Sequence, residues 1–197
     1  MYLGLQPHAL PPLDLGANVG DQLLDVSGRR IAGVDDEVGV FHRDLGAAYP
    51  VVEGLHVTGQ PVDIDAEAFR LKIGGAVETP LSLSLSEIRG MKAERRLVTL
   101  VCPGFFVDEG HWTGVRISDL LDMAGVKEGA TRVEFLAADG SYRATLRLEE
   151  IGGEGMLIAY AFEDKPLPKV HGYPLRVVAK DQPGNRWVKW LGEIVVQ

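Results

Sequence analysis

Residues 97–121 read LVTLVCPGFFVDEGHWTGVRISDLL and contain the single cysteine of the chain, Cys102, at the end of an apolar run. The run is rich in β-branched residues and Pro103-Gly104 follows it, so we predict a strand that stops at Cys102. The end of a strand presents side chains to the loops where sites are commonly built. A lone cysteine is otherwise most often an inert part of the core. The residues alone therefore leave three roles open for Cys102: core residue, nucleophile or metal ligand.

The segments before this stretch continue a pattern of strands and short helices. Residues 69–73 (FRLKI) alternate apolar and polar positions, which is typical of a half-buried strand. Ser84 with Glu87 three residues later forms a capping box, which predicts a short helix that ends near Gly90. The chain therefore combines strands with helices of about two turns.

The segments after it predict a second helix and then mainly strands. Ser118 is the expected N-cap of a helix, and Gly125 its expected C-cap. Further strands are expected at 131–138, 142–148, 156–162, 174–180 and 187–196. The fold class expected is α+β, mostly β, with a mixed or barrel-like sheet.

Two parts of the chain differ in composition. Residues 1–54 are rich in Gly, Pro and Asp and have only short apolar runs, so we expect an extended N-terminal arm. Residues 55–197 carry the strand and helix patterns and are expected to form one domain, which agrees with the usual size of domains.

Composition excludes several classes of protein. The hydrophobic fraction of 46% and a mean hydropathy of +0.04 are those of a globular chain, and no apolar run is long enough to span a membrane. The net charge of −8 argues against nucleic acid as a partner, because such binding depends on phosphate neutralisation. The N-terminus lacks the pattern of a secretory signal. We expect a cytoplasmic location, or a periplasmic one if an export signal has been removed.

Positive charge gathers at the C-terminal end despite the acidic total. Residues 165–197 contain six basic and two acidic residues, a local charge of +4. His171 and Arg176 flank a glycine and a proline, while Arg186 and Lys189 follow in GNRWVKW. Basic side chains near glycine-containing turns can hold a phosphate, although a solvated basic face is the commoner use of such charges. Trp187 and Trp190, next to Arg186 and Lys189 in the sequence, are expected in the core.

A thiol hydrolase is one reading of the cysteine. His111 and His171 are the candidate bases for a Cys–His pair with Cys102. No third group that would orient the base is apparent, and this reading leaves the basic C-terminal cluster unexplained. Dinucleotide-binding, P-loop and zinc-protease motifs are absent from the sequence.

At these residues the chain resembles the sulfite oxidase family, which shares an oxidoreductase molybdopterin-binding domain. FRLKIGGAVETPLSLSLSEI is similar to the family's opening strand, turn and helix, and TLVC with WTGVRISDLLDMAGV to its cysteine strand and following segment. LIAYAFEDKPLPKVHGYPLRVV and GNRWVKWLGEIVV are similar to its C-terminal signature. The four motifs occur in the family's order and cover about residues 55–197.

The resemblance implies a Mo-molybdopterin cofactor and roles for particular residues. Cys102 would be the thiolate ligand of molybdenum, which suits a metal already bound to sulfur. Residues implied to hold the cofactor's phosphate and pterin are His171, Arg176 and Lys189, with Arg186 and His56 as further contacts. Tyr142 resembles the position of an active-site tyrosine.

The implied function is oxygen-atom or two-electron transfer between a small-molecule substrate and an external electron-transfer partner. Sulfite oxidases follow their cysteine with an arginine-bearing stretch, whereas this chain has Phe105 and Phe106 in PGFFVDEGHW. An apolar mouth is a poor host for an anion, so the expected substrate is not sulfite. The alternative, motivated by this insert and the long arm, is a non-catalytic or degenerate molybdopterin-binding module.

Overall fold

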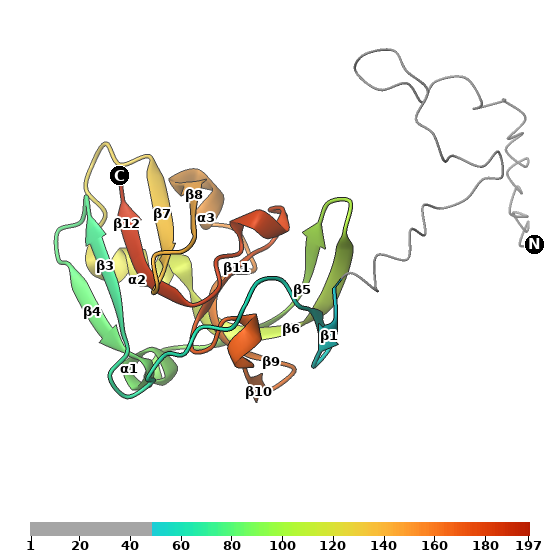
Figure 1. The fold of residues 1–197 in the computed structure, drawn as a ribbon. Helices are drawn as coiled ribbons and strands as arrows, with labels where there is room; N and C mark the ends of the chain where they lie inside the picture. Colours follow the sequence, from blue (N-terminus) through green and yellow to red (C-terminus); the bar gives the residue numbers. More distant parts are fainter. Residues whose placement is uncertain (1–48) are drawn as a thin grey trace, which may run out of the picture. The chain divides into compact units, whose positions relative to one another are not determined.

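The computed structural model describes residues 49–197, so residues 1–48 of the expected arm lie outside the described part of the chain. The remaining residues of that arm are not simply extended. Val51–Val52 (β1) pairs antiparallel with Leu55–His56 (β2) in a small hairpin. The chain then leads without regular structure into the first core strand (Figure 1).

The structure has two five-stranded sheets, and Cys102 lies in the first of them. All strand pairs in this first sheet are antiparallel. The hydrogen-bonded order is β10-β9-β6-β5, and β11 also pairs with β9. These strands are β5 (Glu94–Cys102), β6 (Phe106–Arg116), β9 (Met156–Phe162), β10 (Lys165–Pro166) and β11 (Arg176–Ala179). The strand expected before Pro103-Gly104 therefore ends at Cys102, as predicted.

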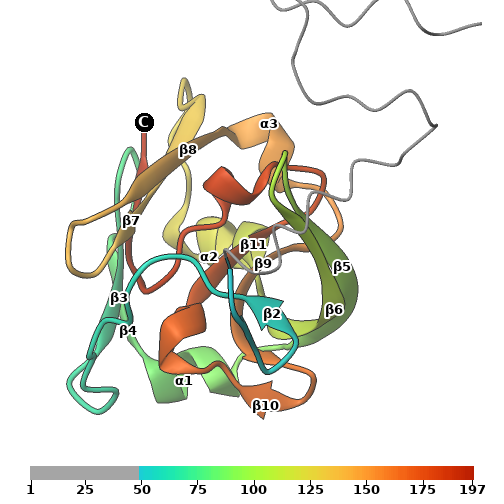
Figure 2. The same ribbon diagram turned by 45° about the vertical axis from the view of Figure 1, so that its right-hand side comes forward.

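The second sheet is mixed and closes with the C-terminal strand. Its order is β4-β3-β12-β7-β8, and β12 runs parallel to β3 but antiparallel to β7. The strands are β3 (Arg70–Gly75), β4 (Leu81–Ser84), β7 (Arg132–Ala137), β8 (Arg143–Arg147) and β12 (Leu191–Val196). Figure 2 shows the two sheets curving around a common interior, so the expected mostly-β, barrel-like α+β class is confirmed.

The helices are short and sit at strand ends. α1 (Leu85–Gly90) begins with the predicted capping box at Ser84. α3 (Leu148–Ile151) and two 3-10 turns, η2 (Lys169–His171) and η3 (Gly184–Arg186), complete the described helical elements. Each therefore serves as a connection between strands.

Helix α2 (Ile117–Ala124) begins two residues earlier than predicted. Its N-cap is Arg116, and the expected cap Ser118 is inside the helix. Strand β6 runs directly into the helix, so the last extended residue is Arg116, and the Ser118 hydroxyl instead accepts hydrogen bonds from the Arg116 guanidinium. The prediction for Gly125 is confirmed, because it ends the helix with φ of 69°.

The stretch after Cys102 is a hairpin rather than an insert. The Phe105 N–H donates to the Cys102 carbonyl at 3.0 Å, and Cys102 pairs with Phe106 across β5 and β6. Gly104 has φ of 77°, a value that glycine adopts without strain. From Phe106 to Trp112 every second side chain faces inward, so this stretch has the period of a strand. The PGFFVDEGHW stretch is therefore the turn and the first part of the second strand of this hairpin.

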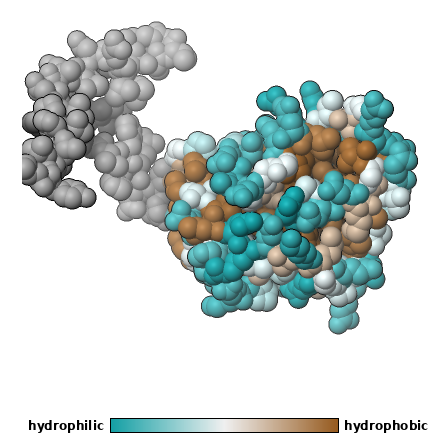
Figure 3. All heavy atoms as spheres, turned by 180° about the vertical axis from the view of Figure 1, so that it is seen from behind, coloured by the Kyte–Doolittle hydropathy of each residue, from teal (hydrophilic) through white to brown (hydrophobic). Residues whose placement is uncertain are grey.

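The core joins both sheets, and polar residues cover much of the outside. Trp112, Phe135 and Leu157 are among its fully buried side chains. On the face seen in Figure 3, hydrophobic residues appear in separate patches among polar ones. Within residues 49–197 there is no helix with the length and apolar character needed to cross a bilayer.

Candidate functional site

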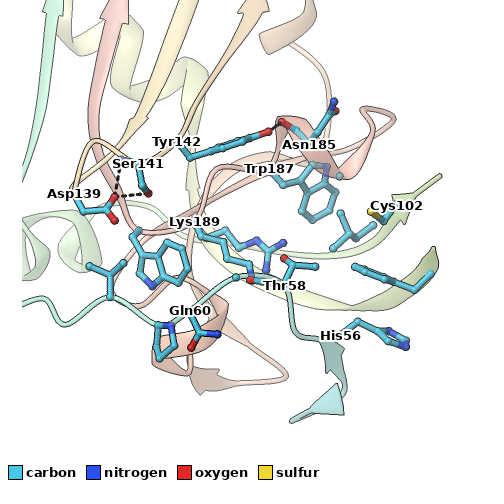
Figure 4. A pocket seen from close by; sticks show the side chains of 18 residues that line it. His56, Thr58, Gln60, Cys102, Asp139, Ser141, Tyr142, Asn185, Trp187 and Lys189 are labelled. Carbon is cyan, nitrogen blue, oxygen red and sulfur yellow. Dashed lines mark hydrogen bonds between the residues drawn. The ribbon is translucent and has the colours of Figure 1, made fainter. Parts of the chain in front are cut away.

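A cavity of about 650 Å³ lies between the segment that begins at His56, the turn that joins β5 to β6, the loop after β7, and the C-terminal residues from Arg176 to Trp190. Figure 4 shows Cys102 and His56 toward one end, Asp139 and Ser141 toward the other, and Lys189 between them. The lining residues come from four separate parts of the chain and are His56, Thr58, Gly59, Gln60, Pro61, Val62, Leu100, Cys102, Phe106, Asp139, Ser141, Tyr142, Arg176, Gly184, Asn185, Trp187, Lys189 and Trp190. The cavity thus joins residues that are far apart in sequence.

Cys102 contributes a half-buried thiol to one end of the cavity. Burial raises the pKa of this thiol, and the nearby charge of Asp108 raises it further. A cysteine with a raised pKa is a poor nucleophile, because the thiolate is the reactive form. A metal would reverse this preference, since a coordinating thiol loses its proton. The environment of Cys102 therefore gives no support to a free nucleophile.

Arg176, on β11, brings an unpaired cation to the cavity wall. The residue is 4% exposed, its Nη1 donates to the His171 carbonyl at 3.3 Å, and its Nε has no hydrogen-bond partner among the described residues. Its guanidinium lies over the rings of Trp112 and Trp187, 5.1 Å and 5.8 Å from their centroids. Burial lowers its pKa to about 10, so it stays charged at neutral pH. Such a cation suits an anionic ligand, because buried charges need partners.

Lys189 supplies a second cation beside the first. Its Nζ donates to the carbonyls of Thr58 and Val170 at 2.8 Å and 3.0 Å. Burial, and then the charge of Arg176, lowers its pKa to about 7. Two cations that destabilise each other are stabilised together by one anion between them.

We predict that Lys189 makes a contribution to the stability of the cofactor-free protein that increases as the pH rises from 7 to 10.5. Over that range the unfolded lysine keeps its proton while the folded one loses it, so the unfolded chain binds more protons. Lys189→Met should remove this contribution, measured as the free energy of unfolding in urea across the range. Lys180→Met, at an exposed lysine, is the control. Identical pH curves for both variants would contradict the burial of a charge at Lys189.

His171 is buried beside the cavity rather than lining it. Its Nε2 is 2.7 Å from the Val52 carbonyl, and its Nδ1 has no partner among residues 49–197. Burial lowers its pKa to about 4, so the imidazole is neutral at physiological pH. Its ring therefore holds β1 in place, and its carbonyl accepts from Arg176.

Two further residues singled out from the sequence differ in their surroundings. Arg186, in η3, is not among the lining residues, and its Nη1 donates to the Thr145 carbonyl at 2.6 Å. Tyr142 does line the cavity, and its hydroxyl donates to the Asn185 carbonyl at 2.7 Å. The tyrosine therefore joins the two loops that border one end of the cavity.

His56 reaches the cavity from β2 through contacts with the β5–β6 hairpin. Its ring stacks on Phe106 with centroids 4.6 Å apart, and its Nδ1 lies 2.5 Å from Asp108 Oδ1. Its main-chain N–H donates to Asp108 Oδ2 at 2.9 Å. Sequence reasoning did not single out Asp108. The available signal is its place in β6, where it follows Phe106 on the inward-facing side.

The histidines proposed as bases do not meet the cysteine. No hydrogen bond between Cys102 and His111 or His171 is present in the described part of the chain, and each ring has another partner. His111 contacts Glu163 at 3.2 Å, on the outward-facing side of β6, while His171 contacts Val52. The geometry therefore gives no support to a thiol hydrolase. Trp187 and Trp190 are buried as expected, but they also line the cavity.

Comparison with known proteins decides the family. Residues 57–197 match the family model described as the oxidoreductase molybdopterin binding domain. The chain belongs to this molybdopterin-binding oxidoreductase family. The uncharacterized oxidoreductase YuiH of Bacillus subtilis is 30% identical to it, over 76% of this chain and 74% of that protein.

Larger members of the molybdopterin-binding family are similar over part of their length. The mitochondrial sulfite oxidase of Macaca fascicularis is 32% identical over 68% of this chain and 30% of its own. The NADH nitrate reductase of Volvox carteri is 28% identical over 89% of this chain, which spans about a quarter (24%) of that enzyme. The crystal structure of the sulfane dehydrogenase SoxCD from Paracoccus pantotrophus matches 69% of this chain and 40% of its own, with a TM-score of 0.65 and 24% identity. This last likeness concerns the fold.

The cavity of the molybdopterin-binding domain fits the group that its family binds. Within residues 49–197 there is no cluster of three His, Cys, Asp or Glu side chains that could hold a metal ion. A dithiolene cofactor supplies two sulfur ligands of its own, so its metal needs fewer ligands from the protein, and the single thiol of Cys102 suits it. The orphaned Arg176 Nε and the two buried cations suit the phosphate of such a cofactor.

Proposed function

We propose that the chain holds Mo-molybdopterin in this cavity, with Cys102 as the protein ligand of molybdenum, and catalyses oxygen-atom or two-electron transfer. The observation that carries the proposal is the placement of one thiol and two unpaired cations on the wall of a single cavity. The thiol is a soft donor for a metal already bound to sulfur, and the cations match a phosphate. When bound, the cofactor supplies the redox chemistry, and the protein binds and orients it.

The protein's side chains would divide this work by position. Arg176 and Lys189 would neutralise the anionic part of the cofactor, since both have charged atoms at the cavity and no carboxylate partner among the described residues. His171 would act indirectly, because it holds β1 and orients the Arg176 guanidinium through its carbonyl. Arg186 would support the loop that carries Asn185. Tyr142 would lie at the border of the cavity, where a substrate can meet it.

The substrate that we propose is a small molecule other than sulfite. Phe106, the first residue of β6, lines the Cys102 end of the cavity, and Asp108, two residues later in the same strand, is 5% exposed. An anionic substrate at this end would lose hydration and find a negative charge nearby. Oxygen-atom transfer moves two electrons, so an external electron-transfer partner would supply or accept them.

The proposal is tested by purifying the full chain with its cofactor and measuring molybdenum and pterin per chain. We expect one cofactor for each chain and dye-linked turnover of a sulfoxide or an N-oxide. Bound cofactor without turnover of sulfite, sulfoxides or N-oxides would favour the non-catalytic module. A chain that never retains pterin would contradict the proposal.

We predict that Phe106→Arg shifts specificity toward sulfite. An arginine at this position adds a cation at the Cys102 end of the cavity, and a hydrogen bond to a charged group is worth about 1.5–3 kcal/mol, roughly tenfold or more in affinity. The measurement is the ratio of kcat/KM for sulfite to that for dimethyl sulfoxide. Phe105→Arg is the matched control, because Phe105 is 51% exposed and does not line the cavity. An unchanged ratio in Phe106→Arg would contradict this view of the mouth.

A further inference from the structure

Both oxygens of the buried Asp108 carboxylate contact the same residue, His56. Oδ2 accepts the His56 main-chain N–H at 2.9 Å, and Oδ1 lies 2.5 Å from the His56 Nδ1. The Asp108 side chain is 3% exposed, whereas the His56 side chain is 21% exposed and lines the cavity. The histidine is therefore the accessible member of the pair, and the aspartate is the hidden one.

The carboxylate determines which nitrogen of the imidazole carries the proton. An ionised carboxylate has only acceptor atoms, so the atom facing it must be a donor, and the His56 Nδ1 is accordingly protonated. In the neutral ring the other nitrogen, Nε2, is then an acceptor. Stacking on Phe106, at 4.6 Å and 15°, fixes the plane of the ring as well. Two independent contacts thus fix both the tautomer and the orientation of His56.

We propose that Asp108 is a positioning residue that locks His56 with Nε2 as a hydrogen-bond acceptor at the Cys102 end of the cavity. The part that concerns a bound ligand rests on the proposed function. The group that His56 contacts is then an N–H or O–H donor, such as the amino or ring N–H of a pterin or the O–H of a water beside the metal. A carbonyl or phosphate oxygen does not fit an acceptor nitrogen.

Substitution of Asp108 by asparagine should reverse this tautomer. The His56 main-chain N–H can only donate, so it requires the Asn Oδ1 at the place of Oδ2. The Asn amide N–H₂ must then face the ring, where it can only donate, and Nδ1 has to become the acceptor. The proton moves to Nε2, and the cavity is offered a donor in place of an acceptor. The change alters one atom type and leaves the volume nearly the same.

The first test uses the cofactor-free full chain and does not depend on what the cavity binds. Nitrogen-15 NMR of the imidazole rings, in mildly alkaline solution, distinguishes the two neutral tautomers, and His56→Gln assigns the signal among the five histidines. We expect wild-type His56 to carry its proton on Nδ1, and Asp108→Asn to carry it on Nε2. A wild-type His56 protonated on Nε2, or a tautomer that is the same in Asp108→Asn, would overturn the proposal.

The second test measures the cofactor. Changes to residues that orient a contacting group typically cost roughly 10–100-fold in affinity, so Asp108→Asn should lose bound pterin about that much faster on dilution. Glu109→Gln is the matched control, because Glu109 is the next residue of β6, is exposed and bonds Thr99. If Asp108→Asn and Glu109→Gln lose pterin at the same rate although the His56 tautomer is reversed, no bound group depends on a hydrogen bond to His56 Nε2. That result would overturn the part of the proposal that concerns the ligand. Absence of pterin from the wild type would instead refute the proposed function and leave the NMR result standing.

Discussion

Replacing Arg176 with methionine is expected to release the cofactor while leaving the cofactor-free protein at least as stable as the wild type. The guanidinium is 4% exposed, and its Nε has no partner in the described part of the chain. An unpaired buried cation costs free energy, and a hydrophobic side chain of similar volume in its place is often neutral or stabilising. Methionine can also fill the space between Trp112 and Trp187.

The same Arg176→Met change should strongly weaken the retention of cofactor by the loaded protein. Each charge-assisted hydrogen bond contributes about 1.5–3 kcal/mol, so losing the bonds of one guanidinium to an anion should weaken retention by about 100-fold or more. Pterin released on dilution and the melting temperature of the cofactor-free protein are the two measurements. Arg132→Met, at an exposed arginine, serves as the control. A cofactor-free Arg176→Met protein that melts well below the wild type, with pterin retained, would show that Arg176 is structural.

Replacing Cys102 with serine is expected to abolish the chemistry at the metal with little effect on the fold. Serine has a similar size, but its oxygen is a harder donor than a thiolate and suits a sulfur-ligated metal less well. Retention of the pterin should change little, because Arg176 and Lys189 remain. Activity with the best substrate should fall by roughly 100-fold or more, at the upper end of what a change around a metal site costs. A variant that kept full molybdenum-dependent activity would refute the role of Cys102.

Local signals predicted much of the fold because they act between neighbouring residues. The capping box at Ser84 and the left-handed Gly125 depend only on their own turns, and both are observed. The strand that ends at Cys102 was also visible in its β-branched run. The start of α2 was missed because the extended backbone of β6 continues to Arg116, and this is decided by pairing with β9 rather than by local sequence.

The site was harder to predict because a sequence shows which residues are charged but not where their side chains point in the fold. His171, Arg176, Arg186 and Lys189 form one basic group in the sequence, yet only Arg176 and Lys189 line the cavity. The other two bond main-chain carbonyls nearby. Pairing between distant segments decides such details, and a single sequence does not reveal it.

Asp108 illustrates the same limit from the opposite side. In the sequence it reads as one acid of a polar stretch, and only the pairing of β6 with β5 turns it inward toward His56, which lies 52 residues away. The segment 56–62, which has little pattern of its own, likewise supplies one wall of the cavity. Both features arise from contacts between segments that are separated in the chain.

The proposed function depends most on Cys102 as the protein ligand of molybdenum. X-ray absorption at the molybdenum edge, on the purified wild type and on Cys102→Ser loaded in the same way, tests it most directly because it counts the sulfur atoms around the metal. We expect the molybdenum of the wild type to have one sulfur neighbour more than that of the serine variant. Equal sulfur counts in the two proteins would contradict it.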